Sequence, residues 1–90
     1  MALSRSITIV NRLGLHARAA AKFVTVASRF EAEVRLVRGE RQVNGKSIMG
    51  VMMLAAGKGT QLEIVVEGPD QQEALDRLTE LVQSRFGEED

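Results

Sequence analysis

The only histidine of this 90-residue chain lies where its imidazole could react with phosphate. His16 stands in the segment Gly-Leu-His-Ala-Arg-Ala-Ala (residues 14–20), in which a turn leads into helix-forming residues. The unpaired N–H groups and the positive dipole end of a first helical turn attract anions. Arg18 adds a guanidinium whose donors suit phosphate oxygens. Taken alone, a surface histidine before a helix is more often an ordinary boundary residue, so the chemical interpretation depends on the rest of the chain.

A second predicted helix begins after a serine. Ser47 precedes the apolar residues 48–54 and is a natural N-cap, which is the commonest role for a serine there. Regulatory phosphorylation is the alternative, because a phosphoserine at a helix N-terminus is tolerated by the fold while it changes the charge of a partner surface. The triplet Gly-Lys-Ser (45–47) also matches the end of a nucleotide-binding P-loop, but Gly39 lies one residue too far upstream. A nucleotide-hydrolysing site is therefore not expected.

The short helix that follows this serine has more apolar residues than one buried face needs. Val51 and Leu54 fall together on the inward side of a helical wheel. A different arc carries Ile48, Met49 and Met52. These three could crowd into the core, with flexible methionines filling gaps, or form an exposed docking patch that adapts to several partners. We favour docking, because so short a helix cannot bury all of its sides in a small domain.

Composition excludes several classes of function. Twelve basic and twelve acidic residues cancel, so neither nucleic acid nor an anionic membrane is expected as the main partner. The absence of Trp and Tyr argues against a base-stacking surface. Without cysteine, and with one histidine, the chain offers no thiolate or imidazole-rich metal site, and we expect no cofactor. No signal peptide or membrane-spanning run is present in the sequence, which predicts a cytoplasmic protein.

Hydrophobic periodicity predicts the elements that position these residues. Period-two alternation predicts strands at residues 6–10, 32–37, 41–43 and 61–67. Helical spacing predicts helices at residues 17–30 and 48–54, and a third that opens at Pro69. The order is β-α-β-β-α-β-α in a single domain spanning residues 1–90. The economical arrangement is an α+β fold, in which helices cover one side of one antiparallel sheet.

The third helix has the plainest pattern. Asp70 and Glu73 are spaced like a capping pair at its start. Its apolar stripe consists of Ala74, Leu75, Leu78, Leu81, Val82 and Phe86. Gly87 then predicts a stop, and the residues that follow, 88–90, form an acidic tail.

Two motifs at characteristic spacing give the chain a family resemblance. Leu15-His16-Ala17-Arg18 at the first helix, Lys46-Ser47-Ile48-Met49-Gly50 at the second, and the element order closely resemble HPr. HPr is the histidine phosphocarrier of the bacterial phosphoenolpyruvate-dependent phosphotransferase system. The resemblance covers residues 6–86 and implies an open-faced sandwich of a four-stranded antiparallel sheet and three helices.

The resemblance also implies roles for individual residues. His16 matches the histidine that takes a phosphoryl group on Nδ1 from phospho-Enzyme I and gives it to an EIIA-type protein. Arg18 matches the arginine that stabilises the phosphate, and Ser47 matches the serine that HPr kinase/phosphorylase modifies in some bacteria. Transfer would occur in transient complexes of a monomer. The expected contact surface consists of Ala17 and Ala20 with Ile48, Met49 and Met52.

One departure from the family pattern follows the arginine. The family commonly has proline there and this chain has Ala19, which also favours a helix, so little functional loss is expected. The run of residues 48–59 and the acidic end are more similar to the nitrogen-related branch of the family, called NPr. Sugar and nitrogen carriers share the same chemistry and differ in their partners.

Two other functions stay open. The chain could be a non-catalytic regulatory interaction module that docks through Ile48, Met49 and Met52, with His16 incidental. It could also be a small-molecule-sensing domain with a pocket between sheet and helices, although no cluster of polar residues converges away from the two helix starts. A substitution of His16 that leaves every partner-dependent activity intact would select the interaction module.

Overall fold

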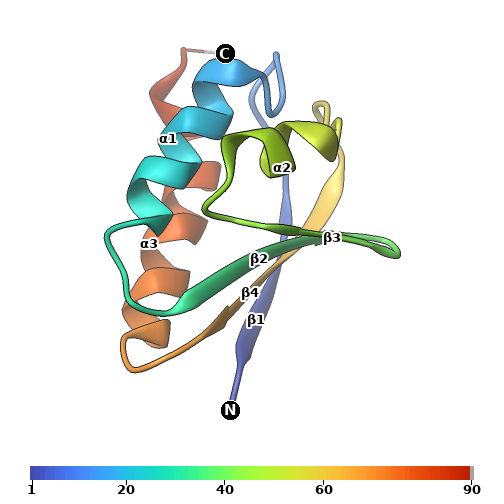
Figure 1. Cartoon of the computed structure of the whole chain (residues 1–90). Coiled ribbons are helices and arrows are strands. Elements are labelled where there is room, and N and C mark those ends of the chain that lie inside the picture. Colours follow the sequence, from blue (N-terminus) through green and yellow to red (C-terminus); the bar gives the residue numbers. More distant parts are fainter. Residues whose placement is uncertain (90) are drawn as a thin grey trace.

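Four strands, each with one apolar face, form one antiparallel sheet whose apolar side is covered by three helices (Figure 1). The computed structural model describes residues 1–89. The strands are β1 (Leu3–Thr8), β2 (Glu33–Arg38), β3 (Arg41–Asn44) and β4 (Gln61–Glu67). The helices are α1 (Ala17–Ala27), α2 (Ile48–Met53) and α3 (Gln71–Gln83), followed by one 3-10 turn, η1 (Arg85–Gly87). The predicted element order and the α+β class are confirmed.

The strand order in the sheet is β1-β4-β2-β3, so β4 is flanked by β1 and β2. Ile7 of β1 lies opposite Leu62 of β4, and Leu36 of β2 lies opposite Ile64 of β4. Because side chains alternate along a strand, this register places the apolar residues of all three strands on one face. β1 begins and ends earlier than predicted, and Ile9 is buried just beyond its end.

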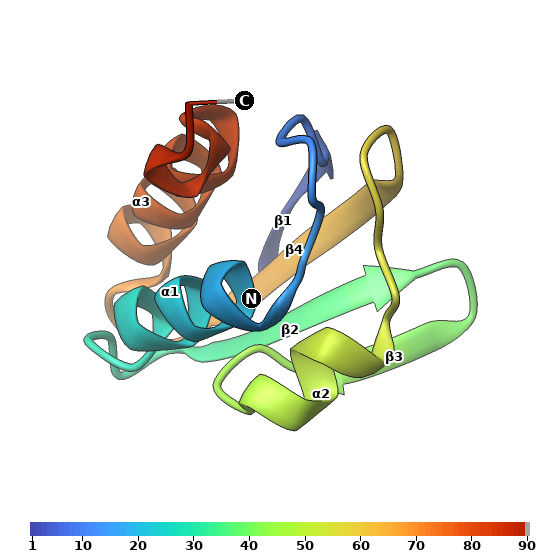
Figure 2. The same cartoon turned by 90° about the horizontal axis from the view of Figure 1, so that it is seen from above.

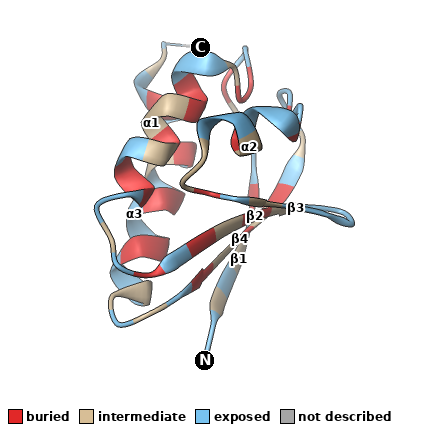
Figure 3. Cartoon of the chain, viewed as in Figure 1, coloured by how far each residue is buried: buried red, intermediate tan, exposed pale blue. Residues whose placement is uncertain are grey.

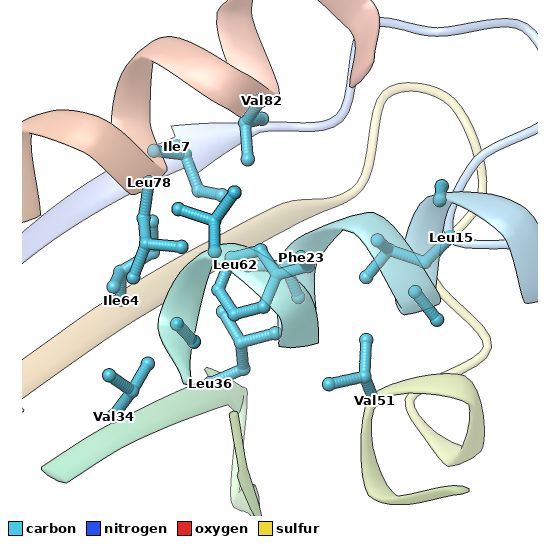
Figure 4. Packing of buried hydrophobic residues seen from close by; sticks show 14 of the residues in the cluster. Ile7, Leu15, Phe23, Val34, Leu36, Val51, Leu62, Ile64, Leu78 and Val82 are labelled. Carbon is cyan, nitrogen blue, oxygen red and sulfur yellow. The ribbon is translucent and has the colours of Figure 1, made fainter. Parts of the chain in front are cut away.

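The core fills the space between this face and the helices (Figure 3). Phe23 of α1 reaches into the centre of the cluster, together with Leu36, Leu62 and Val82 (Figure 4). Burial of such a phenylalanine side chain stabilises the fold by about 1.5–3 kcal/mol relative to exposure. The predicted stripe of α3 is also inward, and only Leu81 of that stripe is partly exposed.

Asp70 has a different role from the predicted one. Its side chain makes no capping hydrogen bond to α3, so the expected pairing with Glu73 is wrong. The carboxylate instead accepts hydrogen bonds from the backbone N–H groups of Glu31 and Ala32, at 2.9 Å each. The bond from Glu31 is the main reason that the pKa of Asp70 lies below its ordinary value. Asp70 therefore ties the start of α3 to the loop before β2.

The chain turns back after α3. Phe86 is buried as predicted but is not part of the helix, which ends at Gln83. Arg85, Phe86 and Gly87 have φ values of 59°, 55° and 77° and so follow one another in the left-handed region. Lys22 of α1 donates a 2.6 Å hydrogen bond from Nζ to the Phe86 carbonyl. This turn brings the end of the described chain to the start of α1, and the predicted acidic residue Asp90 lies outside the described residues (Figure 1).

Candidate functional site

The loop between β1 and α1 sets the position of the histidine. Gly14 has a φ of 67°, and a Cβ on it would lie 2.5 Å from the Ala56 carbonyl oxygen, so glycine is required twice over. Leu15 donates a 2.9 Å backbone hydrogen bond to that same oxygen. Asn11 donates from Nδ2 to the Gly14 carbonyl at 2.8 Å. These contacts fix the turn that places His16 at the start of α1.

His16 is the N-cap of α1. Its backbone is extended and its carbonyl accepts a 2.8 Å hydrogen bond from the Ala20 N–H. Its Nδ1 lies 3.3 Å from the backbone nitrogen of Arg18, whose N–H donates to it. A ring nitrogen that accepts a hydrogen bond carries a lone pair and no proton. The lone pair of Nδ1 therefore lies at the positive end of the helix, where an incoming phosphoryl group would be attracted.

The other ring nitrogen faces a carboxylate. His16 Nε2 lies 2.5 Å from Glu88 Oε2, and the side chains are 28% and 17% exposed. The hydrogen bond from His16, and then that from Asn11, lower the pKa of Glu88. Glu88 is consequently ionised near neutral pH and can only accept, so Nε2 carries the ring proton. Both nitrogens indicate the same tautomer, protonated on Nε2 and nucleophilic on Nδ1.

Glu88 was not among the sequence-predicted site residues. Its distance of 72 positions from His16 leaves no local spacing signal. In the sequence it belongs to an acidic tail, and an acidic tail is usually a solvated end. The glycine at 87 and the apolar Phe86 were the only local signs that the chain is anchored there.

Arg18 is exposed beside the histidine. An open hollow in front of His16 is lined by Arg12, Leu13, His16, Ala17, Arg18, Glu88 and Glu89. It mixes cationic and anionic groups and is open to solvent. A site of this kind can hold a phosphoryl group lightly and leaves it accessible to a second protein.

Ser47 is the N-cap of α2, as the sequence predicts. Its Oγ accepts a 3.1 Å hydrogen bond from the Gly50 N–H. Val51 and Leu54 are fully buried, which confirms the inward side of α2. The outward side exposes four large apolar side chains, Ile48 (44%), Met49 (72%), Met52 (40%) and Met53 (64%). These four residues are called the α2 patch below.

The two α1 residues of the expected contact surface differ in exposure. Ala17 is exposed, whereas Ala20 is fully buried. Ala20 was placed on the contact surface by family resemblance, but it lies on the face of α1 that packs on the core, so that part of the expectation is wrong. Ala19, which replaces the common proline, is also fully buried in the first turn of α1.

A backbone hydrogen bond connects the segment before α1, which carries His16, to the segment that follows α2. Figure 2 shows the chain entering α1 beside the chain that leaves α2, and the Leu15–Ala56 backbone hydrogen bond joins them. His16 and residues 55–57 also line a second, smaller hollow. A protein that covers His16 can therefore also reach the end of α2.

Two further findings concern residues 1–89. Within them, no three His, Asp or Glu side chains come together as a set that could hold a metal ion. The same stretch contains no helix long and apolar enough to cross a membrane.

Comparisons with known proteins identify the family. The family model described as the PTS HPr component phosphorylation site matches residues 3–84. The phosphocarrier protein HPr of Cupriavidus necator is 55% identical over 86 residues, which cover 96% of this chain and 97% of that protein. The crystal structure of HPr-C-His from Thermoanaerobacter tengcongensis has a TM-score of 0.93 and 42% identity, covering 97% of this chain and 98% of that one.

A crystal structure described as an HPr dimer from the same organism is also similar. It has a TM-score of 0.78 and 44% identity, and the match covers 91% of this chain and 94% of that chain. The expectation of a monomer therefore stays a prediction. Sequence, fold and match length agree, and the chain belongs to the HPr family of phosphocarrier proteins of the phosphotransferase system.

Proposed function

We propose that His16 accepts a phosphoryl group on Nδ1 from phospho-Enzyme I and passes it to an EIIA-type protein. The observation that carries this proposal is the geometry of the ring, with an unprotonated Nδ1 at the N-terminus of α1. The bond from phosphorus to the donor atom of phospho-Enzyme I breaks as the Nδ1–P bond forms. Transfer to the EIIA-type protein reverses this exchange, and Nδ1 recovers its electron pair.

The carrier must bind the phosphoryl group without trapping it. A helix terminus at an exposed site contributes about 0.3–1 kcal/mol, which favours the phosphorylated state only modestly. Arg18 lies on an exposed, flexible stem and can bind the phosphoryl oxygens in the open hollow and release them again. No step needs a general base, because Nδ1 already carries a lone pair.

We place partner docking on Ala17 and the α2 patch. The support for this is exposure, since four large apolar side chains stand in water on so short a helix. The hydrogen bond from Leu15 to Ala56 keeps the end of α2 beside His16. A partner whose phosphoryl donor or acceptor site covers His16 could bury the patch in the same complex.

Regulation at Ser47 is the next part of the proposal, with HPr kinase/phosphorylase as the modifying enzyme. The hydroxyl lies at the start of α2, next to the exposed Ile48 and Met49. A phosphate there places negative charge at a helix N-terminus, where the fold tolerates it. The added charge weakens association with an acidic Enzyme I surface. A lower Enzyme I affinity of Ser47→Asp than of wild type supports this, and equal affinity contradicts it.

The setting of the carrier is also part of the proposal. We place it in the cytoplasm, as a monomer, in a sugar or a nitrogen-related phosphotransferase system. The NPr branch is a prediction from residues 48–59 and the acidic end, and the choice of Enzyme I decides it.

The deciding experiment is phosphorylation with purified partners. The protein is incubated with phosphoenolpyruvate and either a sugar-type or a nitrogen-type Enzyme I, and its intact mass is measured, with His16→Ala as the control. The proposal expects one acid-labile phosphoryl group that is absent from the variant, and the preferred Enzyme I assigns the branch. No transfer from either enzyme favours the regulatory interaction module instead.

A further inference from the structure

Three side chains, two from the connection between β1 and α1 and one from the chain after η1, form a polar chain on the side of the imidazole opposite Nδ1. Asn11 donates from Nδ2 to Glu88 Oε1 at 3.0 Å, and Glu88 Oε2 accepts from His16 Nε2. Asn11 is fully buried and also donates to the Gly14 carbonyl, so its amide is held rigidly. Both carboxylate oxygens of Glu88 are therefore engaged, one by the loop before α1 and one by the histidine.

The turn that delivers Glu88 is built for that position. Arg85 and Phe86 are two successive non-glycine residues with positive φ, a conformation that costs roughly 1–2 kcal/mol per residue. The buried ring of Phe86 and the hydrogen bond from Lys22 offset this cost by anchoring the turn on α1. Glu88 follows directly, so its approach to His16 is specified by the fold.

We propose that Glu88 is a positioning residue for phosphoryl transfer at His16, which it holds in the Nε2-protonated form and whose ring charge it balances. The inference rests on the proposed function of His16. It adds a group that acts through the far side of the ring and does not touch the phosphoryl group.

The charge balance during transfer explains why a carboxylate belongs there. The neutral ring starts with a proton on Nε2 and a lone pair on Nδ1. When Nδ1 forms its bond to phosphorus, the proton stays on Nε2 and the ring becomes cationic. Glu88 then faces an imidazolium-like N–H, and a charge-assisted hydrogen bond is stronger than a neutral one. When the phosphoryl group leaves, the electron pair of the N–P bond returns to Nδ1 and the ring is neutral again.

Other charged groups surround the His16–Glu88 pair, and their positions determine which variant is a suitable control. Arg12, Arg18 and Glu89 line the same hollow, and Lys22 attracts the Glu88 carboxylate. Because Glu89 belongs to this hollow, it is not a suitable control. Glu73 of α3 also carries one negative charge, is exposed, and lines neither of the hollows that contain His16. Glu73→Gln is therefore the control for Glu88→Gln, because both remove one negative charge and only Glu88→Gln changes the site.

The first test is NMR on the unphosphorylated full chain. His16 is the only histidine, so ¹⁵N-labelled histidine reports one ring. We expect a downfield Nε2–H proton resonance in wild type and in Glu73→Gln. The resonance should be shifted upfield in Glu88→Gln and lost to solvent exchange in Glu88→Ala. A ring proton that is the same in all four proteins, or that is found on Nδ1 in wild type, overturns the inference.

The second test separates the inference from the proposed function. With Enzyme I as donor, we expect phosphorylation of Glu88→Gln to be about tenfold slower than that of wild type, by analogy with the loss of one charge-assisted hydrogen bond. Glu73→Gln should stay within about twofold of wild type. Equal rates for the two variants contradict charge balancing by Glu88. A wild-type protein that accepts no phosphoryl group contradicts the proposed function, and the NMR result still decides whether Glu88 sets the ring proton.

Discussion

The Nδ1 atom of His16 accepts a hydrogen bond from the backbone N–H of Arg18 across 3.3 Å. One residue thus supplies two different groups near the same nitrogen, since its guanidinium is exposed beside the site while its N–H belongs to the helix end. The backbone N–H leaves the lone pair on Nδ1, and the side chain lines the hollow in which the proposed function places the phosphoryl group.

The position of the phosphoryl group on the ring follows from this hydrogen bond. We expect phosphorylation at Nδ1 only, because Nε2 carries a proton that faces Glu88. Phosphorus–nitrogen coupling in the phosphorylated, ¹⁵N-histidine-labelled protein identifies the bonded nitrogen. The Arg18 amide should shift in the same spectra, because its acceptor changes from a ring nitrogen to the phosphoryl group. Coupling to Nε2 would contradict the tautomer described above.

Removal of the Arg18 side chain should weaken the phosphorylated state. Arg18→Ala keeps the backbone N–H that selects Nδ1 but loses the guanidinium, so we expect a phosphohistidine that equilibrates about fivefold less favourably with its donor. Arg18→Lys keeps the charge without the two-pronged geometry and should lie in between. The phosphorylated fraction at equilibrium with phospho-Enzyme I measures this, and full retention in Arg18→Ala would exclude a stabilising role.

Loss of the α2 cap should cost stability. Ser47→Ala leaves the Gly50 N–H without its side-chain acceptor, and we expect about 1 kcal/mol lower free energy of unfolding in urea. Ser28→Ala is the matched control, because the backbone N–H of Ser28 makes the cap bonds at the end of α1. Equal losses in the two variants would show that the Ser47 hydroxyl contributes nothing as a cap.

Asp70 should make stability depend on pH in the acid range. Its folded-state pKa is lowered, so its contribution is fully present above its unfolded pKa of about 3.9 and disappears as the pH falls through the lower folded value. Between the folded and the unfolded pKa, the unfolded chain binds more protons than the folded chain. The free energy of unfolding therefore decreases as the pH is lowered.

A comparison with Asp70→Asn isolates this effect. In wild type, Glu31 and Ala32 donate to different oxygens of the carboxylate, and the amide replaces one of these oxygens with an NH₂ donor, so the variant should be less stable at neutral pH. Its disadvantage should shrink as the pH falls through the lowered folded-state pKa of Asp70, because the wild-type carboxylate is then protonated too. Urea unfolding at several pH values measures the difference, and parallel curves would contradict a role for the ionised Asp70.

Local patterns were enough for much of the fold. Alternation placed Ile7, Leu36 and Ile64 on the buried face, and helical spacing separated Val51 from the exposed Met52. Each of these predictions depends only on the period of the element and on which residues are apolar. His16, Arg18 and Ser47 could be singled out in the same way, because a helix start is a local feature of sequence.

Long-range pairings were beyond such patterns. Asp70 stands at the start of a helix and looks like its cap, but the backbone of Glu31 competes for the same carboxylate, and that neighbour is 39 positions away. Glu88 is assigned to a solvated tail unless the left-handed turn at Phe86 is known. The sequence position of Ala20 is compatible with a contact surface and with the core-facing stripe of α1. Only the packing of α1 on the core shows that Ala20 is buried.

The position of β1 at the edge of the sheet affects how the protein folds. Arg38 and Arg41 join β2 and β3 as a local hairpin, whereas Thr8 of β1 must find Gln61 of β4 across most of the chain. Closing so long a loop costs entropy before any pairing compensates for it, so we expect β1 to pair late in folding. The loop that carries His16 leaves directly from β1, so we expect this loop to become ordered in one of the last steps of folding.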